Sequence, residues 1–360
     1  MIRHNWNGCF LFVKIAAIGT LVFGASKKID VPLFLFSGQS NMVCLGSTVS
    51  GLPSEDQKKT YENIKIDNRS DNAKQSWSTL KPGFGADANH FGPELYFGKV
   101  LADSLPDKKI AFIKDASSGT YLGQQGGWLP PSSGGPGTLY KNMMTHIDNA
   151  LKTFNNAFDT SIYTPRWAGF IWLQGEFDGW NDQSLAKKYE VNLTNLIKDI
   201  RTKAEDDSMP AIIPMISGSM WQYKDIVRAA EVAVTKTLVN TDTMDTEGFA
   251  LSSDNIHFNA QSQIKIGTIC AQRWLAMGYT KEWWPDPTPI LAAYRSTPST
   301  SLAVFHSPSS LSFFDLSGRV VRPFSTSSVA SQLQHPSMLI GTATSQSGER
   351  HVLKALNLQR

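Results

Sequence analysis

The sequence predicts an α/β fold, in which helices cover both faces of a mainly parallel sheet. Two observations support this prediction. Four nearly continuous apolar runs indicate strands that are buried on both faces, and they cover residues 32–37, 110–115, 167–173 and 211–216. Helical patterns lie between these runs, and strands that alternate with helices are typical of a doubly wound sheet. Right-handed crossovers would then bring the carboxyl ends of the strands to one edge.

Each helix is expected from its own local signal. Pro93 is suited to the first turn of a helix, because its φ angle fits and its missing N–H is not needed there. Residues 183–205 carry apolar side chains at helical spacing, which predicts a helix with one face on the sheet. Another helix is expected over about residues 222–238. The last one follows Asn259, a candidate N-cap, and ends at Gly278.

The chain has 360 residues, which is enough for one large domain with additions at its ends. Residues 1–25 predict a bacterial-type secretion signal, because an apolar run follows a basic residue and ends in small side chains. Residues 26–288 would form the main domain. Residues 289–302 are rich in Pro, Ser and Thr, which predicts a linker. Residues 303–360 predict a small β-rich appendage that is too short to hold much core.

The signal implies a secreted or cell-surface protein. The alternative is a retained membrane anchor, although the apolar run is too short to span a bilayer. No other segment is apolar over about 20 residues, so no membrane partner is expected after signal removal.

Composition argues against several classes of function. The net charge is +3 and no basic cluster is interleaved with aromatic residues, so no nucleic acid is expected as a partner. The seven His residues are scattered without the spacing of metal ligands, so neither a metal nor another cofactor is expected. A secreted protein permits a disulfide between Cys44 and Cys270, but the residues favour two buried free thiols.

The first predicted strand leads into the most informative segment of the chain. Gly38 ends the apolar run and Ser40 follows on a tight turn between this strand and a helix. In open α/β folds, ligands and nucleophiles lie at the carboxyl edge of the sheet, where the next helix also directs free N–H groups. Ser40 is therefore a candidate nucleophile. The alternative is that its hydroxyl caps the helix.

Two further polar segments follow strands at the same expected edge. Residues 114–120 include Gly119, where a backbone N–H can approach a ligand closely; an ordinary βα turn is the alternative. Residues 172–178 include Gln174, whose amide has two N–H donors suited to a developing oxyanion. The alternative for this second segment is a polar loop with a helix cap at Asp178.

A third segment lies just before the last helix. Asp254 precedes His257 by three residues, and on a short turn its carboxylate can hold the imidazole so that the other ring nitrogen faces a serine. Ser40 early in the chain and this pair late in the chain would form a coherent Ser–His–Asp triad at one edge of the sheet.

These segments resemble the SGNH hydrolase superfamily, in its branch of carbohydrate esterase family 6 and the sialate O-acetylesterase-like domain. The blocks at 38–42, 174–178 and 254–257 stand in the order of that branch, and the similarity covers roughly residues 30–280. The resemblance implies a flavodoxin-like three-layer α/β/α sandwich. It also implies removal of acetyl groups from sugars, and many members of the family act on acetylated xylan.

The resemblance implies a role for each matching residue. Ser40 would be the nucleophile, His257 the base and Asp254 the residue that orients the base. Gly119 and Gln174 would join the backbone N–H of Ser40 in an oxyanion hole.

Four further residues are expected to contact substrate or to support the site. Gln39, Asn41 and Glu176 lie within the matching blocks, and Glu176 is the alternative third member of the triad, although the local spacing favours Asp254. Trp128 lies in a Gly-rich loop and is the Trp expected to stack on a sugar, among several in predicted edge loops: Trp128, Trp172, Trp180 and Trp221.

The expected function is a serine esterase that removes O-acetyl groups from a plant cell-wall polysaccharide, acetylxylan above all. The expected partner is thus an acetylated polysaccharide or oligosaccharide. One alternative is a sialate or other glycan O-acetylesterase. Another is a carbohydrate-binding protein that keeps the fold without catalysis.

The appendage has a resemblance of its own. Residues 314–321 resemble the core of a C-terminal sorting domain used in type IX secretion, with Ser317 and Gly318 as a hairpin turn. This resemblance implies the secretion machinery as a partner. The alternative is a degenerate β-appendage without that role.

Overall fold

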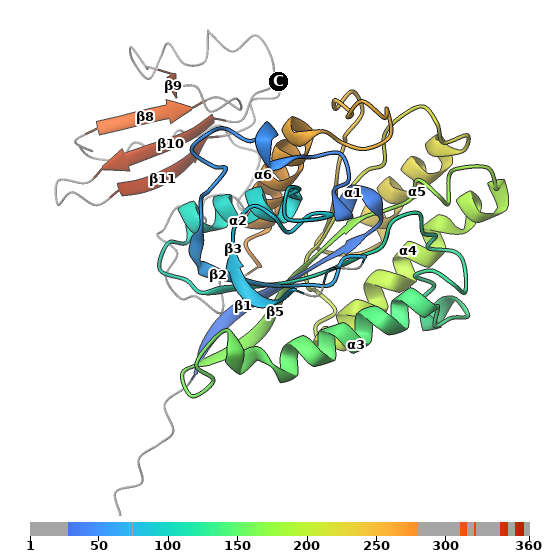
Figure 1. Ribbon diagram of the computed structural model, residues 1–360, viewed down its shortest axis with the longest axis horizontal. Helices are drawn as coiled ribbons and strands as arrows, with labels where there is room; N and C mark the ends of the chain where they lie inside the picture. The colour runs from blue at the N-terminus through green and yellow to red at the C-terminus, as the bar shows by residue number, and fades with distance from the viewer. Residues whose placement is uncertain are drawn as a thin grey trace, which may run out of the picture.

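The computed structural model describes residues 28–279, except 72 and 74, together with four strands between residues 310 and 355 (Figure 1). The expected signal at 1–25 and the expected linker at 289–302 lie outside the described residues, so the structure leaves both as predictions.

A seven-stranded sheet with the order β3-β2-β4-β1-β5-β6-β7 forms the centre of the fold. Every neighbouring pair is parallel except β2 and β3, which are antiparallel. The strands are β1 (Ile29–Gly38), β2 (Tyr61–Asn68), β3 (Gln75–Leu80), β4 (Ile110–Ala116), β5 (Tyr163–Leu173), β6 (Ala211–Pro214) and β7 (Thr241–Met244). The four strands predicted from apolar runs are confirmed, whereas β2, β3 and β7 are additional.

Helices cover both faces of this sheet, which confirms the three-layer α/β/α prediction (Figure 1). One apolar core joins the sheet to α2 and α6, and a second core joins it to α3, α4 and α5. The helices are α1 (Ser40–Val43), α2 (Pro93–Ser104), α3 (Thr138–Lys152), α4 (Gln183–Ala204), α5 (Lys224–Thr237) and α6 (Ala260–Met277). The Asn259 side chain accepts from the Ser262 N–H at 3.0 Å, so the expected N-cap is confirmed.

The central strand β1 is buried on both sides because its side chains alternate between the two cores. Phe34 and Phe36 belong to the core beneath α2 and α6, and Leu33 and Leu35 to the core beneath the other helices. Phe34 also packs edge-on against Trp274, with ring centroids 4.9 Å apart. This double burial explains why β1 is a continuous apolar run.

The strand order places a crevice beside β1. With β2 and the edge strand β3 set aside, the order is β4-β1-β5-β6-β7, which is the flavodoxin-like order of second, first, third, fourth and fifth strand. After β1 the chain first adds strands on one side of it, and from β5 onward it adds strands on the other side. The carboxyl ends of β1 and β5 therefore lie at the switch point where such folds bind ligands.

The two strands can meet closely there only because residue 38 is a glycine. Gly38 has φ +151°, and a Cβ atom at this position would lie 2.0 Å from the carbonyl oxygen of Leu173. The next residue, Gln39, donates its backbone N–H to the same oxygen at 3.0 Å.

The C-terminal part contains a separate antiparallel sheet with the order β11-β10-β8-β9. Its strands are β8 (Ser310–Phe314), β9 (Val320–Val321), β10 (Leu339–Thr344) and β11 (Arg350–Ala355). The predicted β-rich character of the appendage is confirmed. The expected turn at residues 317–318 lies outside the described residues.

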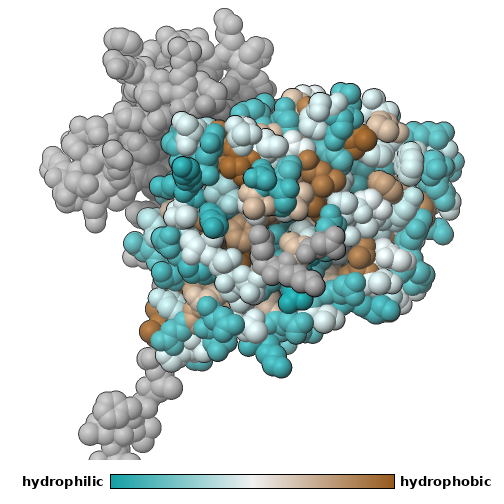
Figure 2. Space-filling view, viewed as in Figure 1, coloured by the Kyte–Doolittle hydropathy of each residue, from teal (hydrophilic) through white to brown (hydrophobic). Residues whose placement is uncertain are grey.

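The visible surface of the described part is mainly hydrophilic, with several apolar patches (Figure 2). Within the residues that the structure describes, no helix is both long and apolar enough to cross a bilayer. Both cysteines of the described part, Cys44 and Cys270, are free and buried, as the residues favoured.

A buried ion pair connects the sheet to the helix layer above it. Lys114 of β4 and Glu94 of α2 are fully buried, and Lys114 Nζ lies 2.8 Å from Glu94 Oε2. The same ammonium group donates to the Phe84 carbonyl at 2.7 Å, and the Gly92 N–H donates to Glu94 Oε1 at 3.1 Å. A buried charge that lost its partner would be costly because burial removes the water that would otherwise solvate it.

We predict that Glu94→Ala lowers the free energy of unfolding by about 3–5 kcal/mol, since Lys114 would stay buried without a counter-charge. Urea denaturation followed by circular dichroism measures this loss. The double variant Glu94→Leu with Lys114→Met is the control, and it should recover most of the stability because no lone charge remains. A loss below about 1 kcal/mol in Glu94→Ala would contradict this assignment.

Candidate active site

Ser40 and His257 line the same pocket, although 217 positions separate them in the sequence. The pocket has a volume of about 320 Å³ and lies at the carboxyl edge of the sheet, where Ser40 begins α1 directly after β1. Its polar lining is Ser40, Ser118, Gly119 and His257, and its apolar lining is Leu45, Phe177, Trp180, Met220, Trp221 and Ile256. The segments predicted to meet at this edge therefore do so.

Ser40 and Gly119 also present free backbone donors. Among the described residues, no carbonyl oxygen or side chain accepts from the N–H groups of Ser40 and Gly119. Gly119 has φ +67°, a conformation that residues with a Cβ atom rarely adopt. Free N–H groups beside a candidate nucleophile are suited to hold a developing oxyanion. The described contacts include no direct hydrogen bond between Ser40 and His257, and in unliganded enzymes such bonds are often long.

Asp254 holds His257 from the same short turn. Its Oδ2 lies 2.6 Å from His257 Nδ1, and its Oδ1 accepts the backbone N–H of His257 at 2.9 Å. Ile256 N–H and the Ser252 hydroxyl donate to Oδ1 as well, at 2.8 and 2.7 Å. Partial burial would raise the pKa of Asp254, but these hydrogen bonds outweigh it and hold the pKa well below the ordinary value. The carboxylate thus remains charged beside the imidazole.

Glu176 occupies a different position. It is fully buried, and its Oε1 accepts from Asn41 Nδ2 at 2.7 Å. Burial raises the pKa of this carboxyl group, and the hydrogen bond from Asn41 opposes that shift only in part. Asp254 and Glu176 were the two candidate partners of His257. Asp254 is the carboxylate that contacts His257 Nδ1.

Asn41 connects three segments of the site. Its Nδ2 donates to Glu176 after β5, and its Oδ1 accepts the backbone N–H of Phe258 at 2.9 Å. Its backbone carbonyl also accepts from Gln263 Nε2 of α6 at 2.7 Å. Because Asn41 follows Ser40 and Phe258 follows His257, these bonds fix the two pocket residues relative to one another.

The expectation that Gln174 donates to the oxyanion is wrong. Gln174 is fully buried, and its Nε2 lies 2.8 Å from Asp178 Oδ2, 2.9 Å from the Thr120 carbonyl and 3.1 Å from Gln39 Oε1. An amide nitrogen has only two hydrogens, so none is left for a ligand. Gln174 instead joins the end of β5 to the loop after β4, and Gln39 likewise supports the site from within.

Asp178 completes this buried support. It accepts the backbone N–H groups of Leu122 and Gly123 at 2.7 and 2.8 Å, in addition to the Gln174 amide. Burial raises its pKa to about 6, against the pull of these hydrogen bonds. The loop that carries Gly119 is thus fixed from behind by side chains that do not reach the pocket.

The expectation that Trp128 contacts substrate is also wrong. Trp128 is fully buried, its Nε1 donates to Thr120 Oγ1 at 2.8 Å, and its ring packs edge-on against Trp172 at 5.8 Å. The Gly-rich loop folds it into the core. Two other Trp residues line the pocket instead, namely Trp180, which is 41% exposed, and Trp221. Both lie in loops that follow β5 and β6, and this position in the sequence favours them over Trp128 as residues that contact substrate.

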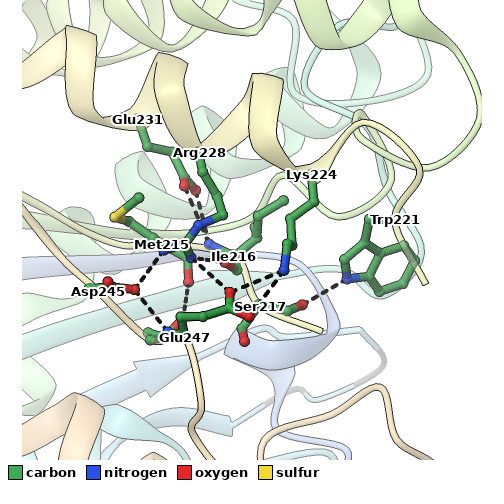
Figure 3. Close-up of polar contacts among 10 residues, drawn as sticks. Met215, Ile216, Ser217, Trp221, Lys224, Arg228, Glu231, Asp245 and Glu247 are labelled. Atoms are coloured by element: carbon green, nitrogen blue, oxygen red, sulfur yellow. Dashed lines mark hydrogen bonds and ion pairs between the residues drawn. The ribbon is translucent and has the colours of Figure 1, made fainter. Parts of the chain in front are cut away.

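Side chains of α5 hold the loop that carries Trp221 (Figure 3). Arg228 donates to the Ile216 carbonyl and, at 2.6 Å, to Asp245 Oδ1. The fully buried Glu231 accepts the Ile216 N–H at 3.2 Å, and Trp221 Nε1 donates to the Ser217 carbonyl at 2.9 Å. One wall of the pocket is therefore anchored to a helix behind it.

Between residues 28 and 279, the remaining histidines have structural partners. His90 Nδ1 lies 2.7 Å from Asp87 Oδ1, and the buried His146 lies between Asp67 and Asp115. In the part of the chain that the structure describes, no group of three or more His, Cys, Asp or Glu side chains is arranged to hold a metal ion.

Comparison with known proteins gives two kinds of match. A family model described as carbohydrate esterase, sialic acid-specific acetylesterase, matches residues 30–276. A probable carbohydrate esterase of Arabidopsis thaliana is 34% identical over 187 residues, which make up 51% of this chain and 64% of the relative. The match thus spans less than two thirds of that protein's length.

A solved structure shares the fold. A protein of Arabidopsis thaliana is 23% identical and superimposes with a TM-score of 0.55 over 69% of this chain and 99% of its own. A carbohydrate acetylesterase from Xanthomonas citri is 15% identical, with a TM-score of 0.49 over 90% of this chain and 72% of its own.

We predict that Asn41→Ala lowers the free energy of unfolding by about 2–4 kcal/mol, because a buried carboxyl group and a buried N–H would both lose a partner. Asn41→Asp is the matched variant, since it keeps the shape but sets a second carboxyl group 2.7 Å from Glu176. Its deficit should shrink as the pH falls and the pair takes up a proton. Denaturation at several pH values measures both effects; a deficit that is independent of pH would contradict the predicted contact.

We predict that Glu176→Gln is tolerated. The new amide keeps the acceptor for Asn41. The Gln39 amide nitrogen donates to Glu176 Oε2 at 3.2 Å, so the Gln39 amide must turn to present its oxygen to the new nitrogen, which a terminal amide can do. A carboxyl group whose pKa is raised by folding stabilises the protein fully at pH below its unfolded value, and that stabilisation is lost as the pH rises through the folded value. The stability of the variant relative to wild type should therefore increase from about pH 4 to pH 8. The opposite trend would show that the charged form is the one that folding favours.

Proposed function

The chain belongs to the carbohydrate esterase family of sialic acid-specific acetylesterases, and on this premise we propose that it removes O-acetyl groups from a polysaccharide through an acetyl-serine intermediate. Family membership confirms the resemblance carried by the three sequence blocks. The observation that carries the mechanistic part of the proposal is the pocket shared by Ser40 and His257, with Asp254 on His257 Nδ1.

In the first step, Ser40 Oγ attacks the acetyl carbonyl carbon while His257 Nε2 accepts the hydroxyl proton. The carbonyl oxygen becomes an oxyanion, and the N–H groups of Ser40 and Gly119 are free to donate to it. Asp254, already charged, stabilises the imidazolium that forms. His257 then gives the proton to the departing sugar oxygen, which leaves the acetyl group on Ser40.

In the second step, His257 accepts a proton from a water molecule, which attacks the acetyl carbon. The same two N–H groups receive the oxyanion again. The proton returns to Ser40 Oγ as the ester bond breaks, and acetate leaves. His257 thus serves both steps from one position, because the Asp254 turn fixes its ring.

We propose acetylxylan as the substrate. Aromatic side chains on one wall of the pocket support a sugar ring as the bound group, since Trp180 and Phe177 lie 5.2 Å apart and Trp221 lies beside them. The family description favours an acetylated sialic acid as the second candidate. Acetate release from acetylated xylan, from O-acetylated sialic acid and from p-nitrophenyl acetate separates these substrates: a preference of tenfold or more in kcat/KM for the sialic acid would overturn the xylan proposal.

We further propose that the protein acts outside the cytoplasm, on the basis of the signal expected at residues 1–25, and that the C-terminal part at 303–360 is recognised by secretion machinery. Both points are tested by expressing the protein, with and without residues 303–360, in a host that has this secretion machinery. Esterase activity is then measured in the medium. Equal activity in the medium without the C-terminal part would remove its proposed role.

We predict that Ser40→Ala abolishes acetate release from acetylated xylan, and that Asp254→Asn lowers kcat by about 10³–10⁴ because the imidazole loses its charged partner. Glu176→Gln should lower kcat by less than about tenfold, since Glu176 supports the site without contacting His257 Nδ1. Ser184→Ala, an exposed serine at the start of α4, is the control. A large loss in Glu176→Gln together with a small loss in Asp254→Asn would reverse the two roles.

A further inference from the structure

We propose that a second pocket, separate from the one at Ser40, binds a neutral sugar unit of the same polysaccharide. This pocket has a volume of about 340 Å³ and lies at the carboxyl ends of β2 and β4, beneath α3. The proposal rests on the proposed function because it identifies the substrate as a polymer that reaches beyond the acetylated unit.

Helix α3 contributes one regular row of side chains to this pocket. Leu139, Asn142, His146 and Asn149 line it at spacings of three, four and three residues, which puts them on one face of the helix. Asn142 and Asn149 are exposed, and the described contacts of their side chains include no hydrogen bond. Two amide groups are therefore free to donate to and accept from a ligand.

The charges in this pocket favour a neutral ligand. The carboxylates of Asp71 and Asp115 line it, together with the guanidinium group of Arg69 and the ring of His146. A third carboxylate, Asp67, contacts His146 from below at 2.7 Å. Positive charge is thus balanced by carboxylates, which would repel an anion. Hydroxyl groups of a sugar both donate and accept, so they suit this mixture of guanidinium, carboxylate and amide groups.

The floor of the pocket is fixed in advance. His146 is buried, its Nδ1 lies 2.8 Å from Asp115 Oδ2, and its Nε2 lies 2.7 Å from Asp67 Oδ1. Burial would lower the pKa of this imidazole, but the two carboxylates hold it above the ordinary value. A floor with both ring nitrogens engaged does not need to reorganise when a ligand binds, which limits the free energy that binding costs.

One short segment separates the two pockets. Ser117 lines the second pocket, whereas Ser118 and Gly119 line the first. Asp71 lines the second pocket and accepts both the backbone N–H and the hydroxyl of Ser118 at 2.8 Å. Because consecutive residues line the two pockets, a polysaccharide that crosses this segment would place units in both of them.

The test compares a large substrate with a small one. In the double variant Asn142→Ala with Asn149→Ala, kcat/KM for acetylated xylo-oligosaccharides should fall by about 10- to 30-fold, from about fivefold per lost hydrogen bond. Turnover of p-nitrophenyl acetate, which is too small to reach the second pocket, should stay unchanged. Lys141→Ala is the control, because Lys141 is exposed on α3 next to Asn142 and does not line the pocket.

Unchanged kcat/KM for the oligosaccharides would overturn the proposal. An equal fall in kcat/KM for the oligosaccharides and for p-nitrophenyl acetate would also overturn it. The substitutions would then disturb the first pocket through the Ser118 segment and would not remove contacts with a sugar.

A binding measurement keeps this proposal separate from the proposed function. Calorimetric titration of Ser40→Ala with unacetylated xylohexaose should give binding that weakens by the same factor when Asn142→Ala and Asn149→Ala are added. If the wild-type protein released no acetate from any ester, the proposed function would fail, whereas this titration would still decide the sugar site. No binding of xylohexaose by Ser40→Ala would overturn it.

Discussion

The geometry of the site depends on the side chain of one buried asparagine. Asn41 donates to Glu176 and accepts from the backbone of Phe258, so it joins the segments after β1 and β5 to the turn before α6. These segments lie far apart in sequence, and the neighbours of Asn41 and Phe258 are Ser40 and His257, whose side chains react together in the proposed mechanism. If this amide were lost, the sheet could persist while Ser40 and His257 drifted apart.

The same interaction explains how a carboxyl group is kept beneath the site without an ion pair to any described residue. Glu176 relies on a neutral amide, and burial favours its protonated form. Asp254, by contrast, lies in a turn rich in N–H donors and stays charged. Glu176 and Asp254 are therefore separated by environment. In the proposed mechanism, the charged carboxylate of Asp254 lies on the imidazole that would become positive.

Much of the fold was predictable because the central strands are apolar on both faces. The strands β2, β3 and β7 were missed, since polar side chains interrupt the apolar run in each of them, although only β3 and β7 lie at the edges of the sheet. In the site, the Asp254–His257 spacing was informative because both residues lie on one turn. Gln174 and Trp128 were misplaced because the burial of a loop side chain depends on distant partners, here Asp178 and Trp172, which no local pattern encodes.

The imidazole and its carboxylate lie three residues apart, so their contact forms within a single turn and needs no help from the sheet. Only the serine has to be brought to them from another part of the molecule. Assembly of the proposed triad, leaving the Gly119 loop aside, is thus one long-range event rather than two. Under mild denaturant, Ser40 would separate from His257 while the contact between His257 and Asp254 was still intact. Esterase activity would then be lost before that contact.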